Sequence, residues 1–195
     1  ERLTGVKVAP IDENGKIDYE KIQTVECDTL VLAAGLVPEN ELTKNAGVKL
    51  NFASLGAITD QFCQTSVKGI YACGNVLYVH DIADYVTDEA RIAGLGAAKY
   101  AMSGYYHDET IFDVKSVGDT KYTMPKIIRK TEDNIKLYVR VNKRLKPAFI
   151  SVWCKGKEIY HKNFNILIHG EMQPIILNGR DIKSDIEVIC GEKND

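Results

Sequence analysis

Two apolar runs in the sequence end at glycine residues where a large ligand could approach the backbone. The first, residues 29–34, stops at Gly35, and the second, residues 70–73, stops at Gly74 and Asn75. Continuous apolar runs of this kind indicate strands buried on both faces of a parallel α/β sheet. Ligands of such sheets collect at the carboxyl ends of the strands, and a glycine there has no Cβ to keep them away. The chemistry indicated is the binding of a cofactor through backbone groups.

A helix predicted after the second run adds partial positive charge at the same place. Residues 86–105 carry alanines at spacings of three and four, with Thr87 as the predicted N-cap and Gly104 as the stop. The N-terminus of such a helix offers unpaired N–H groups and the positive end of the helix dipole. Gly94, Gly96 and the alanines make one helix face very small, so we expect another segment to pack closely against it.

The order and spacing of these motifs resemble those of the FAD-dependent pyridine nucleotide-disulfide oxidoreductases, which have two dinucleotide-binding domains. Residues 29–40 resemble the strand, glycine and proline crossover of that family, and residues 65–75 resemble its second flavin motif. The resemblance implies an FAD domain whose flavin-side residues in this chain are Gly35, Gly74, Asn75, Tyr85 and Val86.

One position departs from the family motif, which usually ends in Asp where this sequence has Asn75. An Asn side chain still accepts a hydrogen bond from the ribityl chain, and it also donates. With the residues that follow it, Asn75 resembles a subset of the family. That subset contains the alpha subunits of sarcosine- and opine-oxidase-like enzymes and the NAD(P)/FAD oxidoreductases associated with glycerol-3-phosphate dehydrogenases. The resemblance also implies that Pro38 and Asn40 shape the crossover between the two domains.

The resemblance implies a parent enzyme that passes hydride between NAD or NADP and FAD, with electrons going on to an acceptor or to an electron-transfer partner subunit. The family binds each dinucleotide at a GxGxxG loop, and this chain contains no such loop. We therefore expect a carboxyl-terminal fragment that is inactive without the missing N-terminal FAD/NAD(P) region. We expect no catalytic acid, base or nucleophile in the chain, and no metal site.

Charge and strand pattern both change near residue 120. Residues 1–120 carry 10 basic and 18 acidic side chains, whereas residues 121–195 carry 15 basic and 9 acidic ones. Five closely spaced strands are predicted in the second part, at residues 135–141, 148–154, 157–164, 174–177 and 186–190. The predicted fold is thus a partial α/β flavoprotein fold in residues 1–119, comprising the end of the NAD(P) domain and the carboxyl-terminal half of the FAD domain. A small all-β, sandwich-like domain is predicted for residues 120–195.

Shorter elements are expected ahead of the second apolar run. Residues 6–9 and 21–26 read as a β-hairpin, and residues 38–47 as a turn into a short helix. The two predicted apolar strands need parallel neighbours, and an unpaired apolar strand edge promotes self-association. We therefore predict that this chain forms a homodimer or rearranges in part.

The histidine, aspartate and cysteine residues outside these motifs favour structural roles over catalytic ones. His80 and Asp81 are adjacent, but neighbours on an extended segment point apart, which favours structural or flavin-edge roles over an acid–base pair. The five cysteines have no CxxC spacing, which favours reduced, buried thiols in a cytoplasmic protein. Cys63, in a predicted loop, is the best candidate among them for a reactive thiol.

The basic excess of residues 121–162 favours docking against an acidic neighbour, including the acidic first half of this chain, over nucleic-acid binding. No apolar run approaches the roughly 20 residues of a membrane span, so no membrane partner is expected. The main interpretation is that the chain is part of an oxidoreductase. The alternative is a non-catalytic fragment whose β-rich domain is a protein-interaction module.

Overall fold

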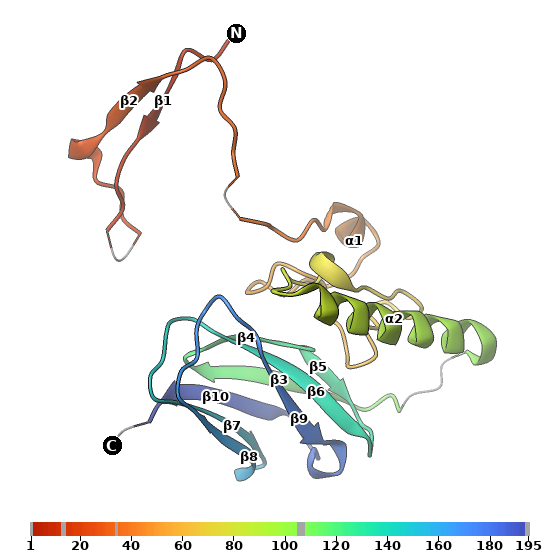
Figure 1. Cartoon of the computed structure of the whole chain (residues 1–195). Coiled ribbons are helices and arrows are strands. Elements are labelled where there is room, and N and C mark those ends of the chain that lie inside the picture. Colours follow the sequence, from red (N-terminus) through yellow and green to blue (C-terminus); the bar gives the residue numbers. More distant parts are fainter. Residues whose placement is uncertain (1, 13–14, 34, 105–107, 194–195) are drawn as a thin grey trace. The chain divides into compact units, whose positions relative to one another are not determined.

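The computed structural model describes residues 2–12, 15–33, 35–104 and 108–193, which form two compact units, residues 1–36 and 37–195 (Figure 1). The first unit contains an antiparallel hairpin of β1 (Gly5–Val8) and β2 (Gln23–Glu26), with the 3-10 turn η1 (Tyr19–Lys21) ahead of β2. The hairpin predicted from the sequence is therefore confirmed.

The first predicted buried strand does not form in this chain. Residues 29–33 have no strand conformation, and the side chains of Leu30, Val31 and Leu32 are 52%, 83% and 79% exposed. A central parallel strand needs hydrogen-bonded neighbours on both sides, and the described residues provide none for this segment. The prediction of a buried strand here is wrong because local apolarity does not supply those neighbours. Ala34 lies outside the described residues.

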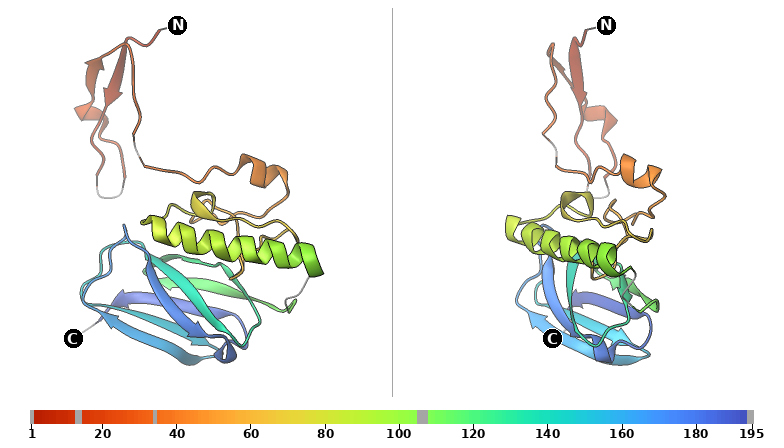
Figure 2. Two further views of the ribbon diagram at one scale, coloured as in Figure 1. Left: turned by 45° about the vertical axis from the view of Figure 1, so that its right-hand side comes forward. Right: turned by 90° about the vertical axis from the view of Figure 1, so that its right-hand side faces the viewer.

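In the second unit, a five-stranded and a three-stranded sheet enclose the main hydrophobic core (Figure 2). Their strands are β3 (Ile111–Gly118), β4 (Thr120–Met124), β5 (Ile127–Arg129), β6 (Asn134–Val141), β7 (Ala148–Cys154), β8 (Lys157–Phe164), β9 (Gln173–Asn178) and β10 (Ile186–Glu192). The larger sheet has the order β5-β3-β10-β7-β8 and the smaller one β4-β6-β9. Alternation along β10 is typical of a sandwich, since Ile186 and Val188 are fully buried between the sheets while Glu187 is exposed.

The five predicted strands are confirmed as β6 to β10, but β3, β4 and β5 were not predicted. β3 pairs in parallel with β10, with Val114 opposite Ile186, so the start and the end of the sandwich lie side by side. Consequently the sandwich begins at Ile111, before the boundary expected between residues 119 and 120. The assignment of residues 1–119 and 120–195 to two domains stays a prediction.

Residues 37–104 form helices and loops in place of the predicted parallel α/β sheet. They contain α1 (Glu41–Asn45), the 3-10 turn η2 (Gly74–Val76) and α2 (Ala83–Ser103). The short helix predicted after Pro38 is confirmed as α1. The second predicted buried strand, residues 70–73, makes a single bridge between Tyr71 and Gln64, so that prediction is wrong. The described chain is mostly β-sheet with few helices.

The long predicted helix is confirmed as α2, which lies alongside the sandwich (Figure 2), with a different start. It begins at Ala83, so Thr87 lies inside the helix, where its hydroxyl donates to the Ala83 carbonyl instead of capping the end. Gly104 ends the helix with φ 70°, as predicted. None of the helices in the described ranges is long and apolar enough to cross a membrane.

The small face of α2 is closely packed at Gly96 and open at Gly94. A Cβ at Gly96 would lie 2.8 Å from a ring carbon of Tyr71 and 3.0 Å from the carbonyl oxygen of Phe62, whereas one at Gly94 would meet nothing within 4 Å. We expect Gly94→Ala to stabilise the chain by up to about 1 kcal/mol, because alanine is the better helix former. Gly96→Ala should destabilise it by about 1–3 kcal/mol through overpacking.

Urea unfolding followed by circular dichroism compares the two variants. They lie on one helix and change the same atoms, so each is the matched control of the other. Equal shifts of the two unfolding midpoints would contradict the close packing of Gly96.

Candidate functional site

A tight turn at Gly74 and Asn75 leads from the preceding loop towards α2. Gly74 has φ 78°, and its N–H donates to Oε2 of Glu89 at 2.6 Å. A Cβ at Gly74 would meet only a methyl group of Val86, at 3.8 Å. The backbone conformation, and not lack of space, therefore requires glycine at this position.

His80 closes this turn onto Asn75. Oδ1 of Asn75 accepts a hydrogen bond from the backbone N–H of His80 at 3.2 Å and lies 3.3 Å from His80 Nδ1. His80 Nε2 lies 3.2 Å from Oε2 of Glu89, and the two side chains are 1% and 11% exposed. The His80 ring also stacks on Tyr78, with 4.0 Å between the ring centroids. Asn75, His80 and Glu89 thus form a polar cluster behind the turn, in which the His80 and Glu89 side chains are buried and Asn75 is exposed.

Asn40 ties the turn to the loop that precedes it. Its side chain is buried, and Nδ2 donates to the carbonyl oxygens of Leu55 and Val76, both at 2.9 Å. Val76 is the last residue of η2, so one amide holds both segments in place. The role implied for Asn40 was to shape a crossover between domains, and the structure places it beside the turn itself.

Asp81 is directed towards the sandwich. Its Oδ1 accepts from Nη2 of Arg140 at 2.8 Å, and its Oδ2 accepts from the backbone N–H of Met172 at 2.7 Å. Arg140, in β6, also donates to the carbonyl oxygen of His169 at 2.9 Å. His80 and Asp81 therefore point to different partners, as expected, and Asp81 connects the loop after the turn to the sandwich.

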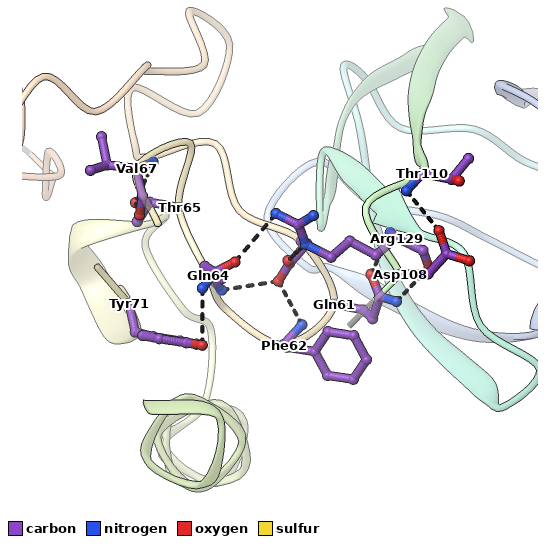
Figure 3. Close-up of polar contacts among 10 residues, drawn as sticks. Gln61, Phe62, Gln64, Thr65, Val67, Tyr71, Asp108, Thr110 and Arg129 are labelled. Carbon is purple, nitrogen blue, oxygen red and sulfur yellow. Dashed lines mark hydrogen bonds and ion pairs between the residues drawn. The ribbon is translucent and has the colours of Figure 1, made fainter. Parts of the chain in front are cut away.

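A second ion pair connects the loop before the turn to β5 (Figure 3). Arg129 Nε lies 2.5 Å from Oδ2 of Asp60, and the two side chains are 7% and 0% exposed. Oδ1 of Asp60 accepts the backbone N–H groups of Phe62 and Gln64, and Arg129 Nη2 donates to the side chain of Gln64 at 3.3 Å. The Gln61 side chain donates a hydrogen bond to the backbone carbonyl oxygen of Arg129 and accepts one from its backbone N–H. A buried network of this kind fixes the path of the loop.

The ion pairs Asp81–Arg140 and Asp60–Arg129 each join an acidic residue from residues 1–120 to an arginine of the sandwich. The predicted docking of the basic region on the acidic first half of the chain is confirmed for Asp60–Arg129 and Asp81–Arg140. The loops on either side of the Gly74–Asn75 turn are therefore positioned by the sandwich.

Of the five predicted flavin-side residues, Gly74, Asn75, Tyr85 and Val86 come together at the N-terminus of α2. Ile82, the N-cap of α2, gives no side-chain cap, so the first N–H groups of the helix have no partner from that residue. The Tyr85 ring packs against Tyr138 of β6, at 5.2 Å between centroids. Gly35 has φ 74° and belongs to the other unit.

Glu89 was not predicted from the sequence. It lies one helical turn beyond the predicted flavin-side residues Tyr85 and Val86, at the i+4 and i+3 positions that share a helix face with them. The spacing of three and four residues is the sequence signal that points to Glu89. Its contact with His80 is visible only in the structure. Asn75 and His80 are five residues apart, so only the turn conformation brings them together.

Cys63, the best candidate for a reactive thiol among the five cysteines, is buried in the structure, as the favoured interpretation of the cysteines expects. The side chain is buried, and that burial raises the pKa of the thiol well above its usual range, with the charges of Glu89 and Asp60 raising it further. The thiolate is the reactive form, so Cys63 is a poor nucleophile. The pKa of the Cys73 thiol is also raised, by burial and then by Glu89.

A cavity of about 450 Å³ lies between α2, the 59–63 loop, and residues of β4 and β6. Phe62, Ile92 and Met124 are among its apolar lining residues, and Glu89 also reaches it. Gly74, Asn75, Tyr85 and Val86 are not among the described residues that line it. The cavity and the Gly74–Asn75 turn are therefore separate features that share Glu89.

Comparison with known proteins identifies similar sequences over much of the chain. The chain is 31% identical over 135 residues to dihydrolipoyl dehydrogenase of Cupriavidus necator, covering 68% of this chain and 26% of that protein. It is 28% identical over 145 residues to the mitochondrial dihydrolipoyl dehydrogenase of Caenorhabditis elegans, covering 69% and 28%. It is 35% identical over 69 residues to the assimilatory nitrate reductase electron transfer subunit of Bacillus subtilis, covering 35% and 9%. No solved structure gave a match.

The chain therefore spans little more than a quarter of the dihydrolipoyl dehydrogenases that it matches, at 26% and 28% of their lengths. The family model of the pyridine nucleotide-disulphide oxidoreductases matches residues 1–103, which end with the last residue of α2 and include the Gly74–Asn75 turn. The sandwich lies beyond the match. This chain belongs to the pyridine nucleotide-disulphide oxidoreductase family, whose members depend on FAD and NAD(P).

Proposed function

We propose that this chain is part of an FAD- and NAD(P)-dependent oxidoreductase and that it contributes the flavin-facing turn of that enzyme. The observation that carries the proposal is Gly74, with φ 78°, followed by the uncapped N-terminus of α2, all within the residues matched by the family model. A backbone without a Cβ and a helix N-terminus together suit an anionic or hydroxyl-rich cofactor.

The residues present fit the flavin side of such a cofactor. Gly74 gives the turn its positive φ, Asn75 offers a side-chain amide, and the first turn of α2, at Tyr85 and Val86, supplies partial positive charge. Gly35 is proposed as a further flavin-side residue on the family resemblance. Bound FAD would supply the acceptor for hydride from the nicotinamide. This chain's own contribution would be to orient the flavin and to stabilise negative charge on it.

We further propose that the chain is inactive alone and acts with the FAD- and NAD(P)-binding region of a longer parent. Its small share of the dihydrolipoyl dehydrogenases, 26% and 28%, and the absence of a GxGxxG loop support this. The exposed apolar residues 30–32 are proposed to pair with strands of that region. They would also drive this chain, when isolated, to form a homodimer.

An electron-transfer partner subunit is proposed on the printed name of the Bacillus subtilis relative. A place in the sarcosine- and opine-oxidase-like subset is proposed on Asn75, and a cytoplasmic location on the scattered cysteines. Arg129 and Arg140 of the sandwich are engaged with Asp60 and Asp81, which favours a supporting role for the sandwich over that of a separate interaction module.

The test is an absorbance spectrum of the chain, and of a version extended upstream, after incubation with excess FAD and removal of free flavin. We expect the extended chain to retain flavin bands and this chain to retain few or none, because part of the site is missing. Gly74→Val in the extended chain should remove the bands, since a β-branched residue resists positive φ. A colourless extended chain would contradict the proposed function.

A further inference from the structure

The cavity between α2, the 59–63 loop and the sandwich has the size of a small-molecule site. Its volume of about 450 Å³ lies within the range of the pockets in which proteins bind small ligands. The described residues that line it include none of the proposed flavin-side residues. A ligand bound here would therefore be additional to the cofactor.

The loop that forms one wall of the cavity is held in a fixed conformation. Cys63 has φ 64°, which is unusual for a residue with a Cβ, and its backbone N–H donates to the carbonyl oxygen of Asp60 at 3.0 Å. The Asp60 side chain accepts two further backbone N–H groups of the loop and pairs with Arg129 of β5. Binding would therefore not require this wall to become ordered, which favours affinity.

Apolar side chains offer a surface for the body of a ligand. Met124 and Ile135 line the cavity from the sandwich and are 3% and 2% exposed, and Ile92 lines it from α2. The rings of Phe62 and Tyr138 are also part of the lining. Such a wall suits a hydrocarbon or aromatic group, whose burial supplies most of the binding free energy.

Glu89 presents a hydrogen-bond acceptor to the cavity that it lines. Its side chain is 11% exposed, and its Oε2 accepts from the N–H of Gly74 at 2.6 Å and lies beside His80. In the described part of the chain, no hydrogen bond reaches the other oxygen, Oε1. A carboxylate oxygen in a largely buried position needs a donor, and Oε1 is the atom that a ligand can satisfy.

The electrostatic potential around this part of the cavity is negative. The thiol of Cys63 also lines the cavity, and its pKa is raised first by burial and then by the charges of Glu89 and Asp60. The cationic lining residues are placed differently. Lys136 lies 3.6 Å from Asp88 and 5.0 Å from the centre of the Tyr138 ring, and Arg91 is exposed. A donor that carries a positive charge is therefore favoured at Glu89.

We propose that this cavity binds an organic amine in its protonated form. The ammonium group donates to Oε1 of Glu89, and the hydrocarbon or aromatic body of the ligand lies against Ile92, Met124 and Ile135. The site is separate from the proposed flavin-facing residues and does not require a flavin. It is adjacent to the Gly74–Asn75 turn through Glu89, whose other oxygen holds the N–H of Gly74.

Methionine methyl groups report binding in the chain itself. The sequence has three methionines, of which Met124 lines the cavity, Met102 is 82% exposed and Met172 is 1% exposed in a core. In the NMR spectrum of the chain with ¹³C-labelled methionine methyl groups, phenylpropylamine should shift the Met124 signal and leave the other two unchanged. Phenylpropionate, which has the same body and the opposite charge, should bind at least about tenfold more weakly.

The Met124 signal is assigned as the one lost in Met124→Leu. If that variant does not fold, the signal is instead the one that persists in both Met102→Leu and Met172→Leu.

Glu89→Gln tests the head group, because it keeps an acceptor for the N–H of Gly74 and removes the charge. It should weaken binding of the amine about tenfold and reduce the preference over phenylpropionate. Glu187→Gln, an exposed position in β10, is the matched control and should change neither. If Glu89→Gln does not fold, Asp133→Asn replaces it. Asp133 is an exposed carboxylate of the lining, so its loss should weaken the amine about two- to fivefold.

Three results would overturn the proposal: a Met124 signal that does not respond to the amine, a carboxylate that binds as tightly as the amine, or an unchanged affinity in the lining variant. No flavin takes part in these measurements. A colourless extended chain that binds the amine would refute only the proposed function, and a flavin-binding chain that does not bind it would refute only this inference.

Discussion

Replacing Arg129 with methionine should lower the free energy of unfolding by about 3–5 kcal/mol, because it leaves a buried carboxylate without its cation. Asp60 is 0% exposed and lies 2.5 Å from Arg129 Nε, so water cannot take the place of the guanidinium without the loop moving. Urea unfolding followed by circular dichroism measures the loss. Hydrogen exchange should show that the 59–65 loop opens more often in the variant, because Asp60, which holds the backbone N–H groups of Phe62 and Gln64, loses its ion-pair partner.

Arg180→Met is the matched control for that variant. Arg180 pairs with Glu132 at 3.2 Å, but the two side chains are 69% and 80% exposed. Water solvates such a pair well, so its loss should cost at most about 1 kcal/mol. Similar losses for the two arginine variants would show that the Asp60–Arg129 pair does not hold the loop.

A double variant separates the charge from the contact. Asp60→Asn together with Arg129→Met removes both charges, so the uncompensated carboxylate disappears. We expect the double variant to be more stable than Arg129→Met alone, which gives a favourable coupling energy between the two sites. Additive losses would mean that the cost of Arg129→Met comes from lost packing and not from the buried charge.

Gly56→Ala should destabilise the chain by more than the roughly 1–3 kcal/mol typical of overpacking. A Cβ at Gly56 would lie 1.7 Å from the carbonyl oxygen and 2.3 Å from the carbonyl carbon of Leu77, and a backbone carbonyl cannot rotate aside as a side chain does. Leu77 directly follows η2, so the segment that carries Gly74 and Asn75 must move. We therefore expect Gly56→Ala to weaken flavin retention by the extended chain as well as stability.

Gly170→Ala is the control for this substitution. Nothing lies within 4 Å of a Cβ built at Gly170, and its φ is not positive. Its free energy of unfolding should stay within about 0.5 kcal/mol of that of the original chain. If Gly56→Ala unfolds at the same urea concentration as Gly170→Ala, the close approach of Gly56 to Leu77 is wrong.

The Asp60–Arg129 ion pair and Gly56 both hold the segments on either side of the Gly74–Asn75 turn. Asp60 fixes the loop that leads to residues 70–73, and Gly56 allows the close approach of Leu77 after the turn. Asn40 spans the two segments by donating to Leu55 and Val76. The Gly74–Asn75 turn is thus held by polar contacts and close backbone packing, in a chain where the expected parallel strands do not form.

The sequence alone was sufficient to identify the family and the elements that depend on neighbouring residues. The ordered series that ends in Gly74 and Asn75 led to the family, and residues 1–103 match its model. The hairpin, the helix α2 and the strands β6 to β10 were predicted because alternation, helical spacing and turn residues are local patterns. Gly104 ended α2 as predicted because a helix stop is local too.

Only the tertiary structure decided which segments and side chains meet. β3, the first strand of the sandwich, pairs with β10, the last one, and Asp60 meets Arg129 at a separation of 69 residues, which no local pattern records. Residues 29–33 have the composition of a buried strand, but a strand exists only where hydrogen-bonded neighbours are present. The polar cluster of Asn75, His80 and Glu89 has the same origin, because Glu89 approaches one side of the His80 ring while Asn75 contacts the other.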